Sequence, residues 1–495
     1  MAGGRTRLGE RGMSVLVAGA GPAGLLVAAE LALAGVGVRV VDRLPARSAF
    51  CRGFTLNARS LELLDRRGLA GRFLAEGPTV PFTMFADPSR PLDLTTLASD
   101  HPYVLGIPQT RTEELLEQWL AELGVPVEWG HEVVGLRAGD TGVDVTLAPG
   151  GTVRADYLVG CDGSRSTVRK LAGIGFPGTD ATRFGLLADV ELADPEALPF
   201  GMTTGVDGTV FAIPRPGYLR VVIDEPHPPE DRDTPVTLDY FQRQLDRVLG
   251  YRVELRAPRW LSRFSDAARQ ADRYVAGRVM LAGDAAHVHP PAGAVGVNVA
   301  LADAMNLGWK LAATVRGHAP AGLLGTYDDE RRSSGAVVLR TTRAQSVLGD
   351  PDPRLDPVRE LLAELAALPQ VNDYLVELVT GVGTRYDMGV PGEHPWLGRL
   401  VPDLGLVVDG EPTSLARLLR PGRPVLLWFA ERPPRVPGTV VLCRAECPVH
   451  PGIEGILVRP DGFAAWISTA ADPQPQSTLD AALATWCAPP PSLAG

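Results

Sequence analysis

The segment that decides the fold of this chain is SVLVAGAGPAGLLVAAELALAGVGVRVVDR, residues 14–43. It passes from an apolar run of strand length to a helix of small residues, and then to a valine-rich run that ends at Asp42. This change of hydrophobic period predicts a βαβ unit, in which a helix joins two parallel strands.

The first turn of this unit contains three glycines, spaced Gly19-x-Gly21-x-x-Gly24. Glycine lets the chain turn tightly and brings backbone N–H groups and a helix N-terminus onto a pyrophosphate. Asp42 follows at the roughly 20-residue distance where an acidic side chain accepts hydrogen bonds from ribose hydroxyls. The pattern predicts a dinucleotide site for FAD or NAD(P), and the alternative is a glycine-rich turn without a ligand.

The composition is that of a multi-domain globular protein. A chain of 495 residues with 45% hydrophobic content can bury several cores, and typical domain sizes suggest about three. The net charge is −10 and no basic block is present, whereas nucleic acids and anionic membranes require clustered positive charge. We therefore expect neither as a partner, and a small molecule as the ligand.

Targeting signals and cysteine frameworks are also not expected. No apolar run approaches the roughly 20 residues that span a bilayer, and residues 1–12 lack the apolar stretch of a secretory signal, which predicts a cytoplasmic protein. The cysteines show no CxxC spacing, which argues against disulfides and a zinc ribbon. They are Cys51, Cys161, Cys443, Cys447 and Cys487.

Two further motifs lie downstream of the glycine-rich turn. One is CDGSRSTVR, residues 161–169, and the other is Gly283-Asp284 at the start of the loop LAGDAAHVHPPAGAVGVN, residues 281–298. His287 and His289 of this loop could be metal ligands beside Asp284. Further ligands at a recognisable spacing are missing, so we expect no metal and a structural or cavity-lining role for both histidines.

Alone, the two downstream motifs indicate an ordinary turn and a helix cap. Together with the glycine-rich turn they resemble the three-motif signature of class A flavoprotein monooxygenases. The resemblance runs through most of the chain and is strongest to the branch of aromatic polyketide hydroxylases and rifampicin monooxygenase in the phenol hydroxylase-like family. It rests on segments such as CRGFTLNARSLELLDRRGL, YLVGCDGSRSTVRK, AGDAAHVHPP, NLGWKLAA and YDMG.

The resemblance implies an α/β fold of three domains. An FAD-binding, Rossmann-like domain of the glutathione reductase type would comprise residues 1–175 and, with a helical region, 276–394. An α+β substrate-binding middle domain would occupy residues 176–275. Residues 395–495 would form a thioredoxin-like domain, which here lacks a redox pair because Cys443 and Cys447 are spaced CxxxC.

The resemblance also implies which residues contact FAD. The pyrophosphate would be held by Gly19, Gly21 and Gly24, with Asp162 and Gly163 nearby, where the nicotinamide nucleotide docks. The ribose, phosphate and ribitol groups would be held by Asp42, Arg43, Arg52, Gln109, Gly283 and Asp284. The loop that positions the flavin ring would include Pro291, Gly293, Val295, Gly296, Val297 and Asn298.

The implied reaction is insertion of one oxygen atom into a polycyclic aromatic, polyketide or antibiotic substrate. NADPH reduces FAD, dioxygen reacts with the reduced flavin, and a flavin C4a-hydroperoxide transfers oxygen, so no side chain is required as acid or base. No second Gly-x-Gly-x-x-Gly unit with a charged partner follows residues 14–43. NADPH is therefore expected to bind transiently at the surface of the FAD domain. The protein is expected to be a monomer or a homodimer.

Other outcomes fit the same motifs. The chain could be a Baeyer–Villiger oxygenase or a flavin-dependent oxidase on the same substrates, or a non-catalytic FAD-binding partner protein. The candidates for the wall of a substrate pocket between the FAD domain and the middle sheet are Phe82, Phe184, Phe211 and Tyr218. For each of them core packing is the favoured interpretation, because large aromatic side chains mostly belong to cores.

The centre of the flavin loop departs from its relatives. It reads Gly293-Ala294-Val295-Gly296, where the resembling polyketide branch usually has Gly-Gly-Gln-Gly. Backbone N–H groups and a helix N-terminus can stabilise negative charge on the N1–C2=O edge of a reduced flavin without a polar side chain. We therefore expect Val295 to tune the ring position rather than to abolish flavin binding.

Overall fold

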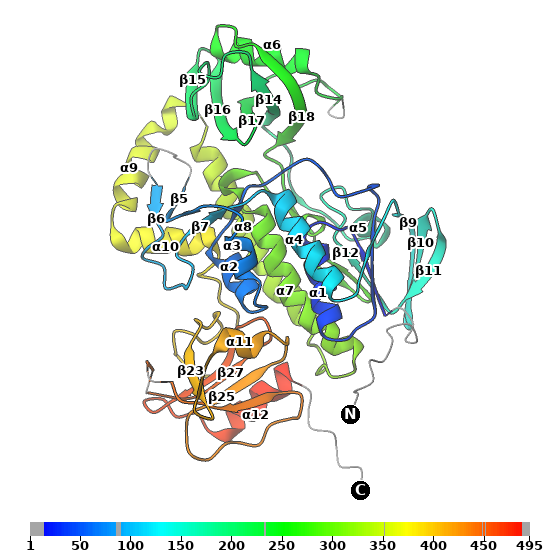
Figure 1. Ribbon diagram of the computed structural model, residues 1–495, viewed down its shortest axis with the longest axis vertical. Helices are drawn as coiled ribbons and strands as arrows, with labels where there is room; N and C mark the ends of the chain where they lie inside the picture. The colour runs from blue at the N-terminus through cyan, green and yellow to red at the C-terminus, as the bar shows by residue number, and fades with distance from the viewer. Residues whose placement is uncertain are drawn as a thin grey trace.

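The computed structural model describes residues 14–85, 91–231, 234–350, 352–447, 449–450 and 452–487. The expectation about a secretory signal in residues 1–12 lies outside them. Three bodies are visible in Figure 1: a central one around helix α7, a middle domain at the top and a C-terminal domain at the bottom. Among the described residues, no helix is long and apolar enough to cross a membrane.

The central domain is built on a six-stranded sheet with four parallel pairings. Its order is β20 (Val275–Ala276), β21 (Val279–Leu281), β12 (Tyr157–Gly160), β1 (Val15–Ala18), β2 (Val38–Asp42) and β8 (Val127–Trp129). The predicted βαβ unit is β1, α1 (Pro22–Leu33) and β2. Strand β1 is at most 2% exposed along its length, as expected for a parallel strand covered on both faces.

Helix α7 (Gly296–Val315) crosses α1 at close range, and a glycine makes this possible. A Cβ atom on Gly308 would lie 2.4 Å from the Cβ of Glu30 on α1. Helices α2 (Ala58–Asp65), α4 (Gln109–Glu122) and α8 (Gly325–Leu348) pack around this pair. Helix α7 begins at Gly296, directly at the end of the flavin loop.

A second, antiparallel sheet forms the middle domain. Its order is β15 (Gly201–Gly205), β16 (Gly208–Arg215), β17 (Tyr218–Asp224), β14 (Phe184–Leu192) and β18 (Leu255–Ser265). Helix α6 (Leu238–Leu249) covers one face, and alternate residues of the strands pack on it in a core of their own. The other face is turned to the central domain, where Arg220 donates to the backbone oxygen of Cys51 at 2.6 Å.

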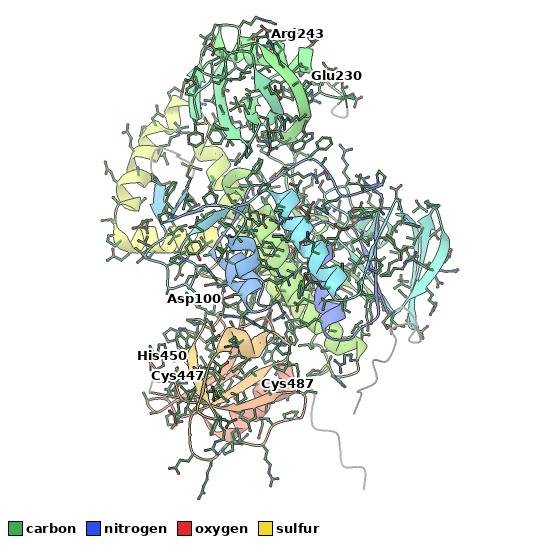
Figure 2. The ribbon with its side chains drawn as sticks, in the orientation of Figure 1. Asp100, Glu230, Arg243, Cys447, His450 and Cys487 are labelled. Atoms are coloured by element: carbon green, nitrogen blue, oxygen red, sulfur yellow. The ribbon has the colours of Figure 1, made fainter. Side chains whose placement is uncertain are left out.

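The C-terminal domain has a four-stranded mixed sheet flanked by α11 (Leu415–Leu419) and α12 (Gln476–Trp486). Its order is β26 (Val441–Arg444), β25 (Val425–Trp428), β27 (Ile453–Val458) and β28 (Ala464–Thr469). The first pair is parallel and the next two are antiparallel, which is the thioredoxin-like arrangement. All five cysteines are free, and Figure 2 shows Cys447 and Cys487 at separate places in this domain.

The C-terminal domain does not have a separate hydrophobic core. Its buried residues, such as Leu419 and Ile456, belong to one continuous cluster with Leu25 of α1. At the boundary, the Asp100 carboxylate accepts a hydrogen bond from the Asp403 backbone N–H at 2.9 Å (Figure 2). The domain is therefore docked on the central one through both apolar and polar contacts.

Candidate active site

A cavity of about 670 Å³ opens at the carboxyl ends of the parallel strands, where ligands bind in open α/β sheets. Its volume is within the usual range of small-molecule sites. The predicted residues that line it are Gly19, Gly21, Asp42, Arg43, Arg52, Gln109, Asp162, Gly163, Gly283, Asp284, Pro291, Val295, Gly296 and Val297. The structure thus brings together most of the residues that the resemblance implied.

The glycine-rich turn is tight for steric reasons. Gly19 has φ +105°, and a Cβ on it would lie 2.2 Å from the Cys161 backbone oxygen. Gly24 does not line the cavity, but a Cβ there would lie 1.9 Å from the Gly19 oxygen. Helix α1 begins after Gly21 without a side-chain cap, so its first N–H groups are available to an anion.

Asp42 is fixed at the end of β2 by two backbone donors. Its Oδ2 accepts from the Ala20 N–H at 2.8 Å and its Oδ1 from the Leu44 N–H at 2.9 Å. The carboxylate is therefore oriented beside the glycine-rich turn, at the edge of the cavity. The exposed Arg43 follows it and lines the same cavity.

Among the charged side chains that line the cavity, those of Asp284 and Arg52 have no hydrogen-bond partner in the described residues. Asp284 lies shortly after β21 and Arg52 lies between β2 and β3 (Thr55–Leu56); both are exposed and line the cavity. A carboxylate and a guanidinium that are free in the protein can accept from ligand hydroxyls and donate to ligand phosphates. These are the properties expected of ribitol and phosphate contacts.

Gln109 is held by a neighbour that the sequence interpretation missed. Its Nε2 donates to Glu113 Oε1, one helical turn further along α4, at 2.8 Å. Burial raises the pKa of the Glu113 carboxyl. Glu113 lines the cavity with Trp129 and His131, which lie at the carboxyl end of β8. Trp129 and His131 could have been predicted as site residues from the sequence, because both lie at the carboxyl end of a strand of the parallel sheet.

Asp162 uses its carboxylate to build the turn it occupies. Oδ1 accepts from the Ser166 hydroxyl at 2.5 Å and Oδ2 from the Val168 N–H at 3.0 Å. These bonds stabilise the start of α5 (Thr167–Leu171). Gly163 has φ +81°, a left-handed conformation that favours glycine.

The flavin loop ends at an open helix N-terminus. Helix α7 begins at Gly296 with no side-chain cap, so its first N–H groups face the end of the cavity. Gly293 and Ala294 have φ values of +74° and +51°; for alanine this left-handed conformation costs about 1–2 kcal/mol. Gly293 does not line the cavity and lies beside Gln345 of α8.

Asn298 does not line this cavity and instead bonds the loop to residues 55–60, at the start of α2. Its Oδ1 accepts from the Asn57 N–H at 2.8 Å and from the Ser60 hydroxyl at 2.7 Å. Its Nδ2 donates to the Thr55 and Ala294 oxygens. The loop is thereby held against α2.

Val295 lies between two cavities. Besides the one described, a second cavity of about 540 Å³ lies between α7, α8 and α10 (Pro369–Thr380), and Val295 lines both. Its side chain is buried, with 9% exposed. The residue that replaces glutamine of the resembling branch thus forms an apolar wall between them.

His287 and His289 differ in their surroundings. His287 is buried and its Nε2 lies 2.7 Å from Asp303 Oδ2. His289 lines the first cavity, and its ring stacks on His287 at 6.5 Å. In the part of the chain that the structure describes, no three potential metal-ligating side chains are grouped as a metal site.

The four aromatic residues that were candidates for the wall of a substrate pocket lie at different places in the structure. Phe211 and Tyr218 lie on the face of the middle sheet that is turned away from α6, whereas Phe82 is 46% exposed on β5 (Phe82–Met84). Phe184 begins β14. On the same face as Phe211, the guanidinium of Arg215 lies 3.4 Å from the ring centroid of Phe54.

Comparison with known proteins agrees with this geometry. A family model described as an FAD binding domain matches residues 12–342, and a model described as the C-terminal part of aromatic-ring hydroxylases matches residues 394–490. The chain belongs to the FAD-dependent aromatic-ring monooxygenases.

Similar proteins support this membership. A 12-dehydrotetracycline 5-monooxygenase/anhydrotetracycline 6-monooxygenase of Streptomyces rimosus is 44% identical over 96% of this chain and 99% of its own length. A rifampicin monooxygenase of Streptomyces venezuelae is 42% identical over 91% and 95%. The solved structure of an anhydrotetracycline hydroxylase from Streptomyces rimosus, 42% identical, has a TM-score of 0.89 and covers 97% of this chain and 100% of its own.

For this monooxygenase we expect Asp284→Ala to bind FAD about 10- to 100-fold more weakly, as for loss of a hydrogen bond to a charged group. The reason is that its carboxylate has no other described partner. The measurement is the Kd of FAD for the apoprotein. Asp329→Ala is the control, because Asp329 is exposed on α8 and does not line the cavity. Unchanged affinity in Asp284→Ala would remove this residue from the site.

We expect Val295→Gln to change FAD affinity less than about threefold, because the backbone N–H groups and the α7 dipole remain. The ratio of product formed to NADPH consumed is expected to change, since a polar side chain would enter the wall between the two cavities. Val337→Gln is the control, as Val337 lines only the second cavity. A large gain in FAD affinity with an unchanged ratio would show that the side chain is the main anchor.

Proposed function

We propose that this monooxygenase binds FAD in the cavity at the strand ends, accepts reducing equivalents from NADPH and inserts one oxygen atom of dioxygen into a polycyclic aromatic substrate of polyketide or antibiotic type. The observation that carries the proposal is the pair of uncapped helix N-termini, α1 and α7, that open on the same cavity. The first suits a pyrophosphate, and the second suits a ring edge that becomes negative on reduction.

The residues present fit FAD along the length of the cavity. Asp42 would accept from the adenosine ribose, the turn at Gly19 and Gly21 would lie under the pyrophosphate, and Asp284 would accept from a ribitol hydroxyl. When bound, FAD supplies the redox chemistry, namely reduction by NADPH and activation of dioxygen. The chain supplies orientation and the electrostatic field of α7, and no side chain acts as acid or base.

The substrate class is proposed from the named relatives and from the middle domain. The relatives act on dehydrotetracycline, anhydrotetracycline and rifampicin according to their names. On the face of the middle sheet toward the central domain, Phe50 and Trp260 stack with ring centroids 5.8 Å apart. Aromatic faces of this kind suit a flat, fused-ring substrate.

NADPH is proposed to dock at the surface beside the strand ends. In the described residues, the glycine-rich turn occurs at the six-stranded sheet, and the C-terminal sheet has no such turn before a helix. The exposed Arg43 and Arg52 lie at the mouth of the cavity and can interact with phosphate.

The test uses the purified protein with anhydrotetracycline as the probe. It is expected to be yellow, to release FAD on denaturation and to oxidise NADPH faster when the probe is present. Mass spectrometry should show a gain of one oxygen atom, and NMR should show a hydroxyl group. A lactone would indicate a Baeyer–Villiger reaction, and a desaturated product an oxidase. A colourless protein that FAD does not reconstitute would overturn the proposal.

A further inference from the structure

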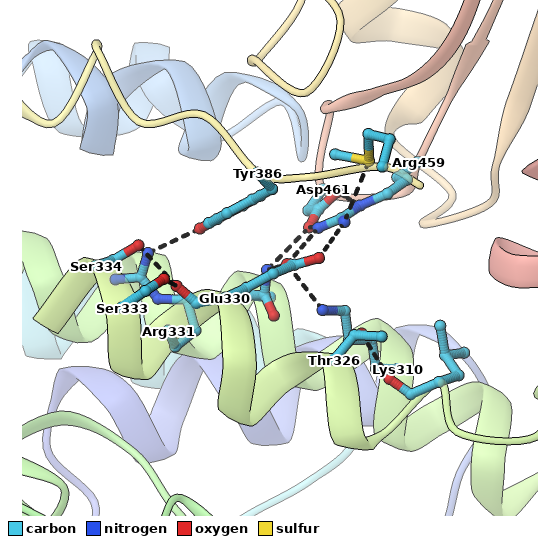
Figure 3. A network of polar contacts seen from close by, with 12 residues as sticks. Lys310, Thr326, Glu330, Arg331, Ser333, Ser334, Tyr386, Arg459 and Asp461 are labelled. Atoms are coloured by element: carbon cyan, nitrogen blue, oxygen red, sulfur yellow. Dashed lines mark hydrogen bonds and ion pairs between the residues drawn. The ribbon is translucent and has the colours of Figure 1, made fainter. Parts of the chain in front are cut away.

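A buried polar network joins the C-terminal domain to the flavin loop, and the proposed function makes no use of it. Figure 3 shows its outer and central parts, from Arg459 and Asp461 to Tyr386 and Arg331. It contains Tyr386 of the YDMG motif and Asn306 and Lys310 of NLGWKLAA, two motifs that carry the family resemblance without an assigned role. The network consists of two hydrogen-bonded groups, one around Glu330 and one around Arg331, which are neighbours on α8. Arg459 also lies over the ring of Tyr386, with its guanidinium carbon 5.5 Å from the ring centroid.

The outer end of the network is Arg459, immediately after β27. Its Nη1 and Nη2 donate to the two oxygens of Glu330 on α8 at 2.6 and 3.0 Å, and it also pairs with Asp461 at 2.5 Å. Lys310 donates to Glu330 from α7 at 2.9 Å. Two cations thus balance two carboxylates in a site where all four side chains are at most 6% exposed.

The central part of the network is Tyr386, which contacts both domains. Its ring packs on Phe463 of the C-terminal domain with centroids 4.6 Å apart. Its hydroxyl accepts from Arg331 Nη1 at 2.8 Å, and Arg331 follows Glu330 on α8. Arg331 Nε in turn donates to Asp303 Oδ1 at 2.7 Å.

The inner end of the network is the flavin loop itself. Asp303 Oδ2 accepts from the Gly283 N–H at 3.0 Å and lies 2.7 Å from His287 Nε2. Although burial alone would raise it, the charges of His287 and Arg331 hold the pKa of Asp303 below its ordinary value. The next residue after Gly283 is Asp284, whose carboxylate enters the cavity.

We propose that Tyr386 and Arg459 are positioning residues of the flavin site, through which the docked C-terminal domain holds Arg331, Asp303 and the 283–298 loop in the geometry that FAD requires. The inference rests on the proposed placement of FAD. A network with buried charges is rigid because each lost contact leaves a buried polar atom unpaired. The C-terminal domain therefore contributes to the site without contacting the cofactor.

Tyr386→Phe tests this with the loss of one oxygen atom, while the ring remains on Phe463. We expect the Kd of FAD to rise by up to about tenfold, because the energy of the lost hydrogen bond to the charged Arg331 is the upper limit on its coupling to FAD. The midpoint potential of the bound flavin should fall, because the α7 N-terminus is less well placed to stabilise the reduced ring. The matched control is Tyr240→Phe in the middle domain, whose hydroxyl donates to the buried, ion-paired Glu225 at 2.6 Å.

Arg459 variants test the outer end of the network. Arg459→Lys keeps the charge but not the planar fork to Glu330 and Asp461, so it should keep the fold and lose part of the FAD affinity and of the flavin potential. Arg459→Met is expected to lose both and to be less stable. The double variant Arg459→Met/Glu330→Gln removes one positive and one negative charge, so Lys310 and Asp461 remain as one cation and one anion. Charge balance and folding should therefore return. The flavin potential should stay low, because the two hydrogen bonds from the Arg459 guanidinium that fix α8 are absent.

The outcomes are distinct. The inference is supported if Tyr386→Phe shifts Kd and potential while Tyr240→Phe, with a similar loss of thermal stability, shifts neither. It is overturned if both tyrosine variants behave alike, or if Tyr386→Phe and the double variant keep the wild-type potential. A wild-type protein that binds no FAD would refute the proposed function instead.

Discussion

Gly24→Ala is expected to destabilise the folded protein by about 3 kcal/mol or more, as overpacking against an immovable backbone does, and to leave it without FAD. The added Cβ would lie 1.9 Å from the Gly19 backbone oxygen. Neither side can yield, since Gly19 is itself held against the Cys161 oxygen. Helix α1 would have to move away from β1, and its N-terminus would leave the pyrophosphate position. The measurements are thermal unfolding and FAD content.

Two other glycines separate steric strain from lost ligand contact. Gly21 has φ −76°, and a Cβ there meets no atom within 4 Å, so Gly21→Ala should fold normally. It should bind FAD weakly, because the methyl group would occupy space in the cavity that is proposed to hold the pyrophosphate. Gly325 on α8 also has free space, and Gly325→Ala should change neither property. If Gly24→Ala were as stable as Gly325→Ala, the close approach of α1 would not limit this position.

Arg67→Met is expected to lower the free energy of unfolding by about 3–5 kcal/mol, the usual cost of removing one partner from a buried ion pair. Arg67 holds both oxygens of Glu30 on α1 at 2.6 and 2.7 Å, and it also donates to the backbone oxygens of Leu419 and Pro460 in the C-terminal domain. The substitution leaves the Glu30 carboxylate, whose side chain is 2% exposed, as a buried charge without its ion-pair partner. Chemical unfolding followed by tryptophan fluorescence measures the loss.

The double variant Glu30→Met/Arg67→Met identifies the cause. Replacing both members of a buried pair with apolar side chains is often nearly neutral. Most of the lost free energy of unfolding should therefore be recovered, except the part that comes from the hydrogen bonds of Arg67 to Leu419 and Pro460. If the stability is recovered, the destabilisation in Arg67→Met comes from the unpaired Glu30 carboxylate. A double variant less stable than Arg67→Met would instead assign it to packing between the two domains.

The sequence was most informative where the chemistry is local. The spacing of Gly19, Gly21 and Gly24 with Asp42 reflects one turn and one strand, and these residues meet as expected around the start of α1. The roles of Asp284 and Arg52 toward FAD remain predictions, although both side chains enter the cavity without a described partner.

Contacts between distant parts of the chain could not be predicted in the same way. Arg459 and Glu330 are 129 residues apart, and no periodicity links them. Asn298 was expected at the flavin, but its amide is bonded to residues 55–60, which the loop sequence alone does not indicate. The C-terminal segment reads as a separate domain because its elements are local, whereas its shared core depends on tertiary packing.

The separate core of the middle domain has a consequence for how such enzymes diversify. Its strands place alternate residues on α6, so the opposite residues, including Phe211 and Tyr218, contribute little to holding that domain together. Mutations at these positions, unlike mutations of Arg220, which bonds the central domain, can accumulate without loosening the cofactor scaffold, which is stabilised by the other core. One oxidising framework can thus be adapted by natural selection to ring systems of different size and shape.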